Sequence, residues 1–265
     1  SRVTREKLMI EVEGVVPALG QALNKRGYTE LTPVQTAVIA NELKDSDLLV
    51  SAQTGSGKTV AFGLNMAPTL LGGANTFEFS PVPLALVVAP TRELAMQVKG
   101  ELEWLYADTG GSITTCVGGM DMRNERRALQ RGAHIVVGTP GRLRDHIERG
   151  SLDTTGFKAI VLDEADEMLS QGFKDQIYKI FQYMPSEIQI GLFSATIPEE
   201  NGNVPQDAMN ELQEFQKQFR KDANRRLHLK ELTDRSYEEL DVLKGPSGKY
   251  PKRYRTQIPG RRQLP

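Results

Sequence analysis

A glycine-rich segment, SAQTGSGKT at residues 51–59, has the spacing of a phosphate-binding loop. Gly55 and Gly57 carry no side-chain bulk, so backbone N–H groups there can curl around phosphate oxygens. A helix expected to begin at Lys58 would add the partial positive charge of its N-terminus. Lys58 would then reach the outer phosphates of a nucleotide, and the hydroxyl of Thr59 would be a ligand of Mg²⁺. The alternative interpretation is a glycine-rich turn with a surface lysine.

Three acidic residues stand where an apolar run ends, in VLDEAD at residues 161–166. Asp163, at the expected strand tip, can hold Mg²⁺ directly or through water. Glu164 can orient and deprotonate an attacking water, which makes it the candidate general base. Taken alone, acids in this pattern are also typical of a solvated helix start. Together with the phosphate loop they predict a nucleotide-hydrolysing centre.

These residues need strands and helices to position them, and the pattern around them is regular. Short apolar runs predict strands at 48–52, 84–89, 112–117, 134–137, 159–162 and 188–193, and helical patterns lie between them at 33–43, 58–71, 91–106, 122–131, 141–149 and 173–184. The runs are nearly continuous in Val, Ile, Leu and Ala, which is typical of strands buried on both faces of a parallel sheet. We therefore expect an α/β fold, a mostly parallel sheet with helices on both faces, whose ligands lie at the carboxyl ends of the strands.

Composition excludes several classes of protein. Hydrophobic residues make up 39% and charged residues 25% of the chain, as in ordinary globular proteins. No apolar run is long enough to cross a bilayer, and the charged N-terminus has no signal-peptide pattern, so we expect no membrane partner. The only cysteine, Cys116, favours a reduced intracellular compartment, most simply the cytoplasm. The net charge of −1 hides a contrast, because the residues after 200 carry +5 and those before carry −6.

The order of motifs resembles the N-terminal RecA-like, ATP-binding domain of DEAD-box ATP-dependent RNA helicases, a branch of the P-loop NTPases. The matching segments are GYTELTPVQ (27–35, the Q motif), AQTGSGKT (52–59), PTRELA (90–95), GG (118–119), TPGR (139–142), DEAD (163–166) and SAT (194–196). Several motifs in the family's order are far more specific than any one of them.

The resemblance implies roles for individual residues. ATP would be held by Tyr28, Thr32, Gln35, Thr54, Gly55, Ser56, Gly57, Lys58, Thr59 and Asp166, with Lys58, Asp163 and Glu164 catalytic and Thr59 and Asp163 on Mg²⁺. The RNA backbone would lie along Pro90, Thr91, Arg92, Gly118, Gly119, Thr139, Gly141 and Arg142. Ser194 and Thr196 would couple the two sites. The amide of Gln35 can both donate and accept, which suits the edge of adenine. For each loop residue, an ordinary cap or turn is the alternative.

Two departures from the family pattern stand out. No Phe, Tyr or Trp occurs in residues 1–26, where the family places an aromatic residue against adenine, so we expect weaker nucleotide binding. Nothing after Thr196 resembles the second RecA-like lobe with its arginine fingers. We therefore expect residues 1–232 to form one helicase lobe and residues 233–265 a basic, flexible tail.

The sequence thus predicts an ATP- and RNA-binding lobe that hydrolyses ATP and does not unwind RNA by itself. Its partners would be RNA, bound through the backbone without sequence preference, and a separate second lobe or a regulatory protein. The alternative is a non-catalytic module that binds RNA or a protein, with the tyrosines and basic residues of 249–255 stacking on bases. Another P-loop NTPase, such as a DNA helicase, is a weaker alternative. His134 and His146 are expected to be structural, and Cys116 a core residue.

Overall fold

A computed structural model describes residues 13–40, 43, 46–194, 210 and 213–221. By its internal contacts the chain divides into two units, residues 1–215 and 216–265, and each is considered by itself. All the labelled strands and helices belong to the first unit. The predicted tail, Thr196 and the segment before Glu13 lie outside the described residues, so the expectations for them stay predictions.

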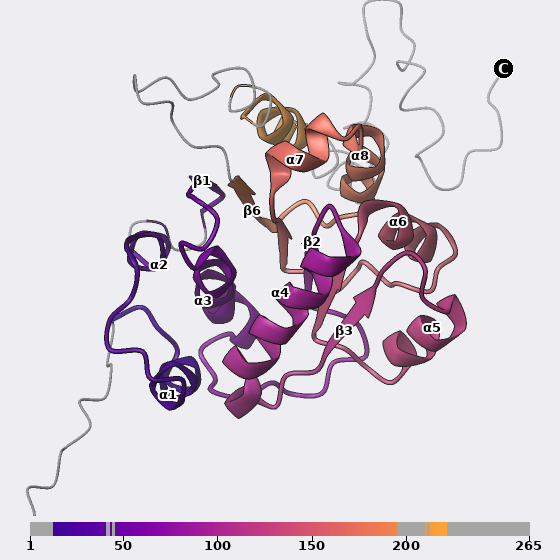
Figure 1. Ribbon diagram of the computed structural model, residues 1–265. Coiled ribbons are helices and arrows are strands. Elements are labelled where there is room, and N and C mark those ends of the chain that lie inside the picture. Colours follow the sequence, from indigo (N-terminus) through magenta and orange to yellow (C-terminus); the bar gives the residue numbers. More distant parts are fainter. Residues whose placement is uncertain (1–12, 41–42, 44–45, 195–209, 211–212, 222–265) are drawn as a thin grey trace, which may run out of the picture. The chain divides into compact units, whose positions relative to one another are not determined.

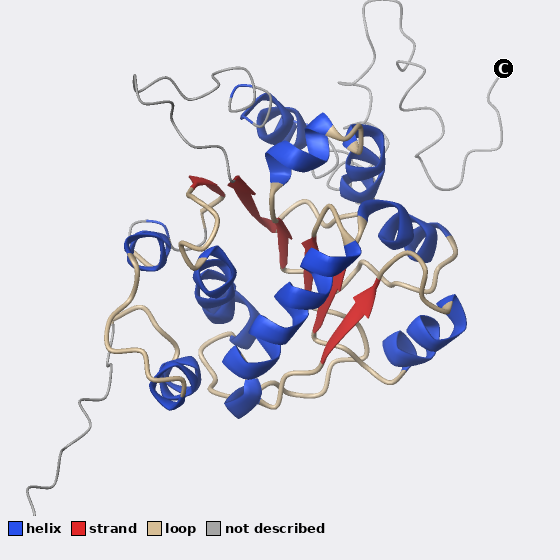
Figure 2. Cartoon of the chain, viewed as in Figure 1, coloured by secondary structure: helices blue, strands red, loops and turns tan. Residues whose placement is uncertain are grey.

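The centre of the first unit is a six-stranded sheet (Figures 1 and 2). Its strands are β1 (Leu48–Ser51), β2 (Ala85–Val88), β3 (Ile113–Cys116), β4 (Ile135–Gly138), β5 (Ala159–Leu162) and β6 (Gln189–Ser194). They lie in the order β1-β6-β5-β2-β4-β3, and every pairing is parallel. The prediction of a mostly parallel α/β sheet is confirmed.

Helices lie against both faces of the sheet, and most of them connect consecutive strands (Figure 1). They are α1 (Pro17–Lys25), α2 (Pro33–Val38), α3 (Lys58–Leu71), α4 (Arg92–Leu105), α5 (Met122–Gln130), α6 (Pro140–Glu148), α7 (Ala165–Ser170) and α8 (Lys174–Gln182), with a short 3₁₀ turn, η2, at Ala107–Thr109. Burial along the strands shows the double cover. Val87 packs in one hydrophobic cluster with α3 and α4, whereas its neighbours Leu86 and Val88 are fully buried outside that cluster.

The helix boundaries mostly agree with the sequence patterns. The helix expected over 33–43 ends earlier, because α2 stops at Val38, whose carbonyl instead accepts a hydrogen bond from Asn65 Nδ2 at 2.8 Å. The helices α1 and α7 were not expected. Residues 213–221 are helical, and Phe215 is buried against Phe181. No described helix is long and apolar enough to cross a membrane.

Parallel pairing has one consequence for the motifs: all strands end at the same edge of the sheet, here called the carboxyl edge. We divide it into a β1 side, formed by the segments after β1, β6 and β5, and a β3 side, formed by the segments after β2, β4 and β3. The phosphate loop and the acidic centre lie on the β1 side, and the PTRELA, GG and TPGR segments lie on the β3 side. The fold thus collects motifs that are distant in the sequence.

Candidate nucleotide and nucleic-acid site

The phosphate loop leaves β1 at Ser51 and ends at the first residue of α3, as expected. Gly55 and Gly57 have φ values of +82° and +87°, in the left-handed region that favours glycine. A Cβ atom on Gly57 would also collide with the side-chain amide of Gln35. Both glycines are therefore needed for the backbone path.

The Q motif is attached directly to this loop. Thr32 and Gln35 form a capping box at the start of α2, in which each side chain bonds the other's backbone. Thr32 Oγ1 donates to the carbonyl of Ser56 at 2.9 Å, and Gln35 Nε2 donates to the carbonyl of Gly57 at 3.3 Å. Gln35 is fully buried. Its amide supports the loop and keeps one donor and one acceptor position beyond these bonds.

Lys58 lies within the curve of the loop and is only 8% exposed. Its Nζ donates to the carbonyls of Ala52 and Gln53, at 2.7 and 3.1 Å. The loop backbone is in turn tied to the sheet, because Ala52 N donates to the carbonyl of Ser194 at 3.1 Å. Ser194 thus joins the phosphate loop to β6, the strand that separates β1 from β5.

Asp163 follows β5 and is 3% exposed, so it is not a solvated residue of a helix start. Burial, together with the nearby charge of Glu164, raises its pKa to about 6, although Lys58 and the backbone N–H of Glu164 act in the opposite direction. An ionised carboxyl group here is therefore short of positive charge. That is the condition in which a divalent cation binds favourably.

Glu164 has a strained backbone, with φ of +50°, and it is the one non-glycine residue in the described part of the chain with a positive φ. Its N–H donates to Asp163 Oδ1 at 3.0 Å. Burial raises its pKa, the acids Glu167 and Asp166 raise it further, and Lys58 lowers it. A carboxylate with a raised pKa is a better proton acceptor, which suits a general base.

These observations fit a nucleotide with Mg²⁺. The hydroxyl of Ser56 is buried and has no hydrogen-bond partner among the described residues, so a group held in the loop could satisfy it. Oxygen donors from Thr59 and Asp163 are the ligand type that Mg²⁺ prefers. The loop, its lysine and the acidic centre have the geometry and the chemical groups that could hold a nucleotide.

The β3 side begins with Pro90, Thr91 and Arg92 after β2. The hydroxyl of Thr91 caps α4 by accepting from the N–H of Leu94 at 3.2 Å, so this residue has a structural role besides any contact with a ligand. Arg92 is exposed, and its Nη2 lies 3.4 Å from the sulfur of Met120. Arg92 thus reaches across the edge to the loop that follows β3.

That loop carries Gly118 and Gly119, both exposed, and Gly119 has φ of +78°. Thr139 and Pro140 begin α6 after β4, with Gly141 half-buried beside them. Gly118, Gly119 and Arg92 therefore present small residues and one cation on the same edge. The structure brings the predicted RNA-track residues together on the β3 side.

A buried carboxylate, missed in the sequence, holds this side together. Glu125, on α5, is 6% exposed. Its Oε1 accepts from the N–H of Val117 at 2.8 Å, and its Oε2 accepts from Arg142 Nη1 at 3.0 Å and is paired with His146 Nε2 at 2.7 Å. Arg142 Nη2 also donates to the carbonyl of Met120 at 3.1 Å. The sequence signal was an acid four residues after an N-cap aspartate, which suggests only an exposed helix.

One of the predicted site residues, Tyr28, stands apart from the loop. Tyr28 packs against Trp104, with ring centroids 6.0 Å apart, and has no described contact with the phosphate loop. Its role in ATP binding stays a prediction.

A cavity of about 580 Å³ lies away from the motifs, between residues 14–17, 38–40 and the C-terminal half of α3.

Comparison with known proteins identifies the family. The DEAD/DEAH box helicase family matches residues 32–204. The chain therefore belongs to the DEAD/DEAH box helicase family. The matched segment includes the phosphate loop, the acidic centre and the β3 side.

Individual relatives are similar over most of this chain. Eukaryotic initiation factor 4A-3 of Arabidopsis thaliana is 43% identical over 195 residues, which cover 73% of this chain and 45% of that protein. DEAD-box ATP-dependent RNA helicase CshA of Geobacillus kaustophilus is 41% identical over 198 residues, covering 75% and 41%. A crystal structure of a DEAD box protein from Methanococcus jannaschii aligns with a TM-score of 0.63 and 36% identity, covering 72% of this chain and 50% of that one. The chain thus spans less than half the length of these curated relatives.

Proposed function

We propose that these 265 residues form the ATP- and RNA-binding lobe of an RNA helicase, which hydrolyses ATP slowly by itself and does not separate RNA duplexes alone. The observation that carries the proposal is the placement of the phosphate loop and the buried Asp163 on one side of the carboxyl edge, with the PTRELA, GG and TPGR segments on the other. Both ligands would thus bind along one edge.

In this proposal Lys58 and the loop N–H groups bind the phosphates, while Gln35, braced against the loop, faces the base. Thr59 and Asp163 hold Mg²⁺, which neutralises charge that develops on the phosphate oxygens. Glu164 orients a water and takes its proton. Ser194 and Thr196 link these events to the β3 side.

The slow rate of ATP hydrolysis follows from the catalytic groups that these residues supply, which do not include arginine fingers. Arginine fingers accelerate P-loop NTPases by about 10³–10⁵-fold. No HRxGRxGR-like run occurs in the sequence to supply them. A second lobe or another protein that provides such arginines would therefore raise the rate and complete the helicase.

The test measures ATP hydrolysis, with and without single-stranded RNA, and duplex separation by the same chain. We expect measurable binding of both ligands, slow hydrolysis and no duplex separation. Robust unwinding by these residues alone would contradict the one-lobe proposal. RNA binding with no ATP binding at any Mg²⁺ concentration would instead favour the non-catalytic module. Preference for DNA in a competition assay would favour a DNA helicase.

A further inference from the structure

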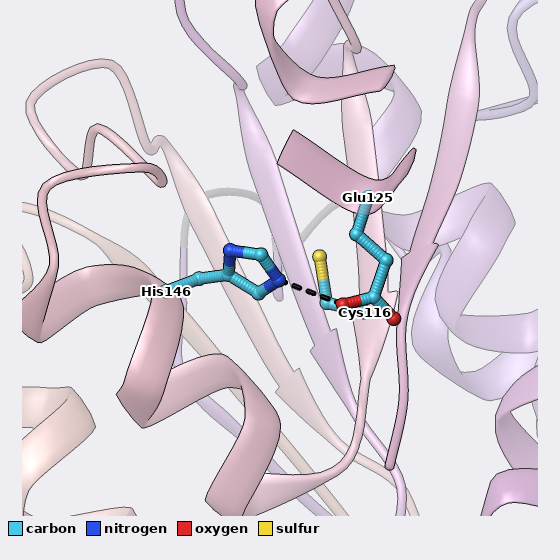
Figure 3. A group of neighbouring side chains, drawn as sticks. All are labelled: Cys116, Glu125 and His146. Atoms are coloured by element: carbon cyan, nitrogen blue, oxygen red, sulfur yellow. Dashed lines mark hydrogen bonds and ion pairs between the residues drawn. The ribbon is translucent and has the colours of Figure 1, made fainter. Parts of the chain in front are cut away.

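The loop that carries Gly118 and Gly119 is exposed, yet it must hold its shape for a nucleic-acid backbone to lie on it. The cluster around Glu125 connects this loop to α5 and α6. Figure 3 shows its bond to His146. Through its oxygens, Glu125 reaches the backbone just before the two glycines and two side chains of α6. One carboxylate therefore joins three segments that are separate in the sequence.

We propose that Glu125 and His146 are positioning residues that lock the GG loop and the start of α6 in the geometry that binds the RNA backbone. The inference rests on the proposed function, because it assigns a role within that RNA track. It changes the expected role of Arg142, whose side chain is only 14% exposed and is bonded to Glu125 and to the carbonyl of Met120. Arg142 braces the loop from within the protein, leaving Arg92 as the more exposed cation.

The chemistry of the cluster explains why it is rigid. Glu125 carries three charge-assisted or buried hydrogen bonds, which are stronger than bonds between neutral exposed groups. His146 is fully buried, and its Nδ1 has no hydrogen-bond partner among the described residues. A ring that donates from Nε2 to Glu125 and keeps Nδ1 as a bare acceptor leaves no buried N–H unpaired. The histidine is thereby fixed in one orientation.

Glu125, His146 and Cys116 are residue types that bind metal ions, and they lie side by side (Figure 3). One ligand atom of each lies within 4.8 Å of the others. The surroundings favour the brace over the metal. The guanidinium of Arg142 already occupies Glu125 Oε2 and would repel a cation. Burial and the charge of Glu125 raise the pKa of Cys116, which disfavours the thiolate that metals require.

The first test is Glu125→Gln, read out with a fluorescent single strand of ten uridines and, separately, with ATP. The amide nitrogen must face either the N–H of Val117 or the donors of Arg142 and His146, so either orientation places donor against donor. We expect RNA affinity to fall about tenfold, with ATP affinity changed by about twofold or less because the β1 side is distant. Glu148→Gln, an exposed residue at the end of α6, makes the same charge change and should leave both affinities unchanged.

A second pair of variants separates positioning from packing. His146→Gln retains a side-chain donor that can reach Glu125, whereas His146→Leu fills similar space without one. We expect RNA affinity to be kept in the first and reduced several-fold in the second, with melting temperatures recorded for both. This pair decides the question if Glu125→Gln does not fold.

The outcomes are distinct. Equal loss of RNA and ATP affinity, or equal loss in both histidine variants, shows a merely structural cluster and overturns the inference. RNA affinity that is unchanged in both Glu125→Gln and His146→Leu also overturns this inference, and it leaves the proposed function standing. If the unsubstituted chain does not bind the RNA strand, the proposed function fails and takes this inference with it.

Discussion

The two sides of the carboxyl edge each bury a carboxylate near a cation, but they use it differently. On the β3 side, Glu125 has hydrogen-bond partners at both oxygens and Arg142 as its counter-ion. On the β1 side, burial and neighbouring acids raise the pKa of Asp163 to about 6 despite the presence of Lys58. Lys58 instead donates to two loop carbonyls.

This difference is the one expected between a structural brace and a reactive site. A carboxylate whose partners are all within the protein stabilises a shape. A buried carboxylate with too little positive charge around it costs free energy, which cation binding can offset. The strained φ of Glu164 lies on the same β1 side. We therefore expect substitutions on the β1 side to affect chemistry and those on the β3 side to affect RNA affinity.

The largest effect is expected from Glu164→Gln. Without the carboxylate, the attacking water loses its base, and single-turnover ATP hydrolysis should fall by about 10²–10⁴-fold. RNA binding in the absence of nucleotide should stay the same. Glu167→Gln, an exposed neighbour on α7, is the matched control with the same charge change. A loss of less than threefold in Glu164→Gln would remove this residue from the mechanism.

A smaller effect is expected from alanine at the two glycines of the phosphate loop. Both have positive φ, so either substitution costs about 1–2 kcal/mol of backbone strain and weakens ATP binding by roughly 5–30-fold. Only at Gly57 does the new Cβ also collide with Gln35, since nothing lies within 4 Å at Gly55. Preference for ATP over GTP should therefore fall in Gly57→Ala and persist in Gly55→Ala. Equal selectivity in the two variants would exclude Gln35 from recognition of the base.

On the β3 side a matched glycine pair tests the loop itself. Gly119 has φ of +78°, and a Cβ atom there would lie 3.2 Å from Arg92 Nη1, whereas Gly118 has no positive φ and open space around it. Gly119→Ala should weaken binding of single-stranded RNA by about fivefold, from a strain cost of ~1 kcal/mol. Gly118→Ala should change it less, and neither should change ATP affinity. A loss of ATP affinity in either variant would break the division into two sides.

Sequence patterns predicted the elements better than the contacts between them. The strand runs and the phosphate loop are local signals, since glycine spacing and continuous apolar residues are visible along the chain. The short helix α7 was missed because its six residues are too few for a periodic pattern.

The partners of Glu125 could not be predicted for a different reason. Its partners are Val117, Arg142 and His146, which approach it only because β3 and β4 are neighbours in the sheet. No single segment of the sequence predicts which strands will be neighbours. The sequence likewise suggested phosphate contact for Arg142 and adenine contact for Gln35. The structure shows that both side chains also hold a neighbouring loop: Gln35 bonds the phosphate loop, and Arg142 bonds the loop after β3.

The last expected effect is on stability and its dependence on pH, from Asp163→Asn. The pKa of Asp163 lies near 6 in the folded chain, above its ordinary value of 3.8, so the folded state binds this proton more tightly than the unfolded state does. The ionised group therefore lowers the stability of the folded chain. This cost is absent below about pH 4, where the group is protonated, and is fully present above about pH 6, on the order of 1–3 kcal/mol.

Asn removes the charge at all pH values. The melting temperature of Asp163→Asn should exceed that of the parent by several degrees at pH 8, and the gap should close towards pH 4, while Mg²⁺-dependent ATP hydrolysis is lost. The gain in stability is limited because the substitution also removes a negative charge near Lys58. Burial is nevertheless the larger influence on the pKa of Asp163. A gap that widens at low pH, or a lower melting temperature at pH 8, would mean that Asp163 is a satisfied structural acid like Glu125 and that the two sides do not differ.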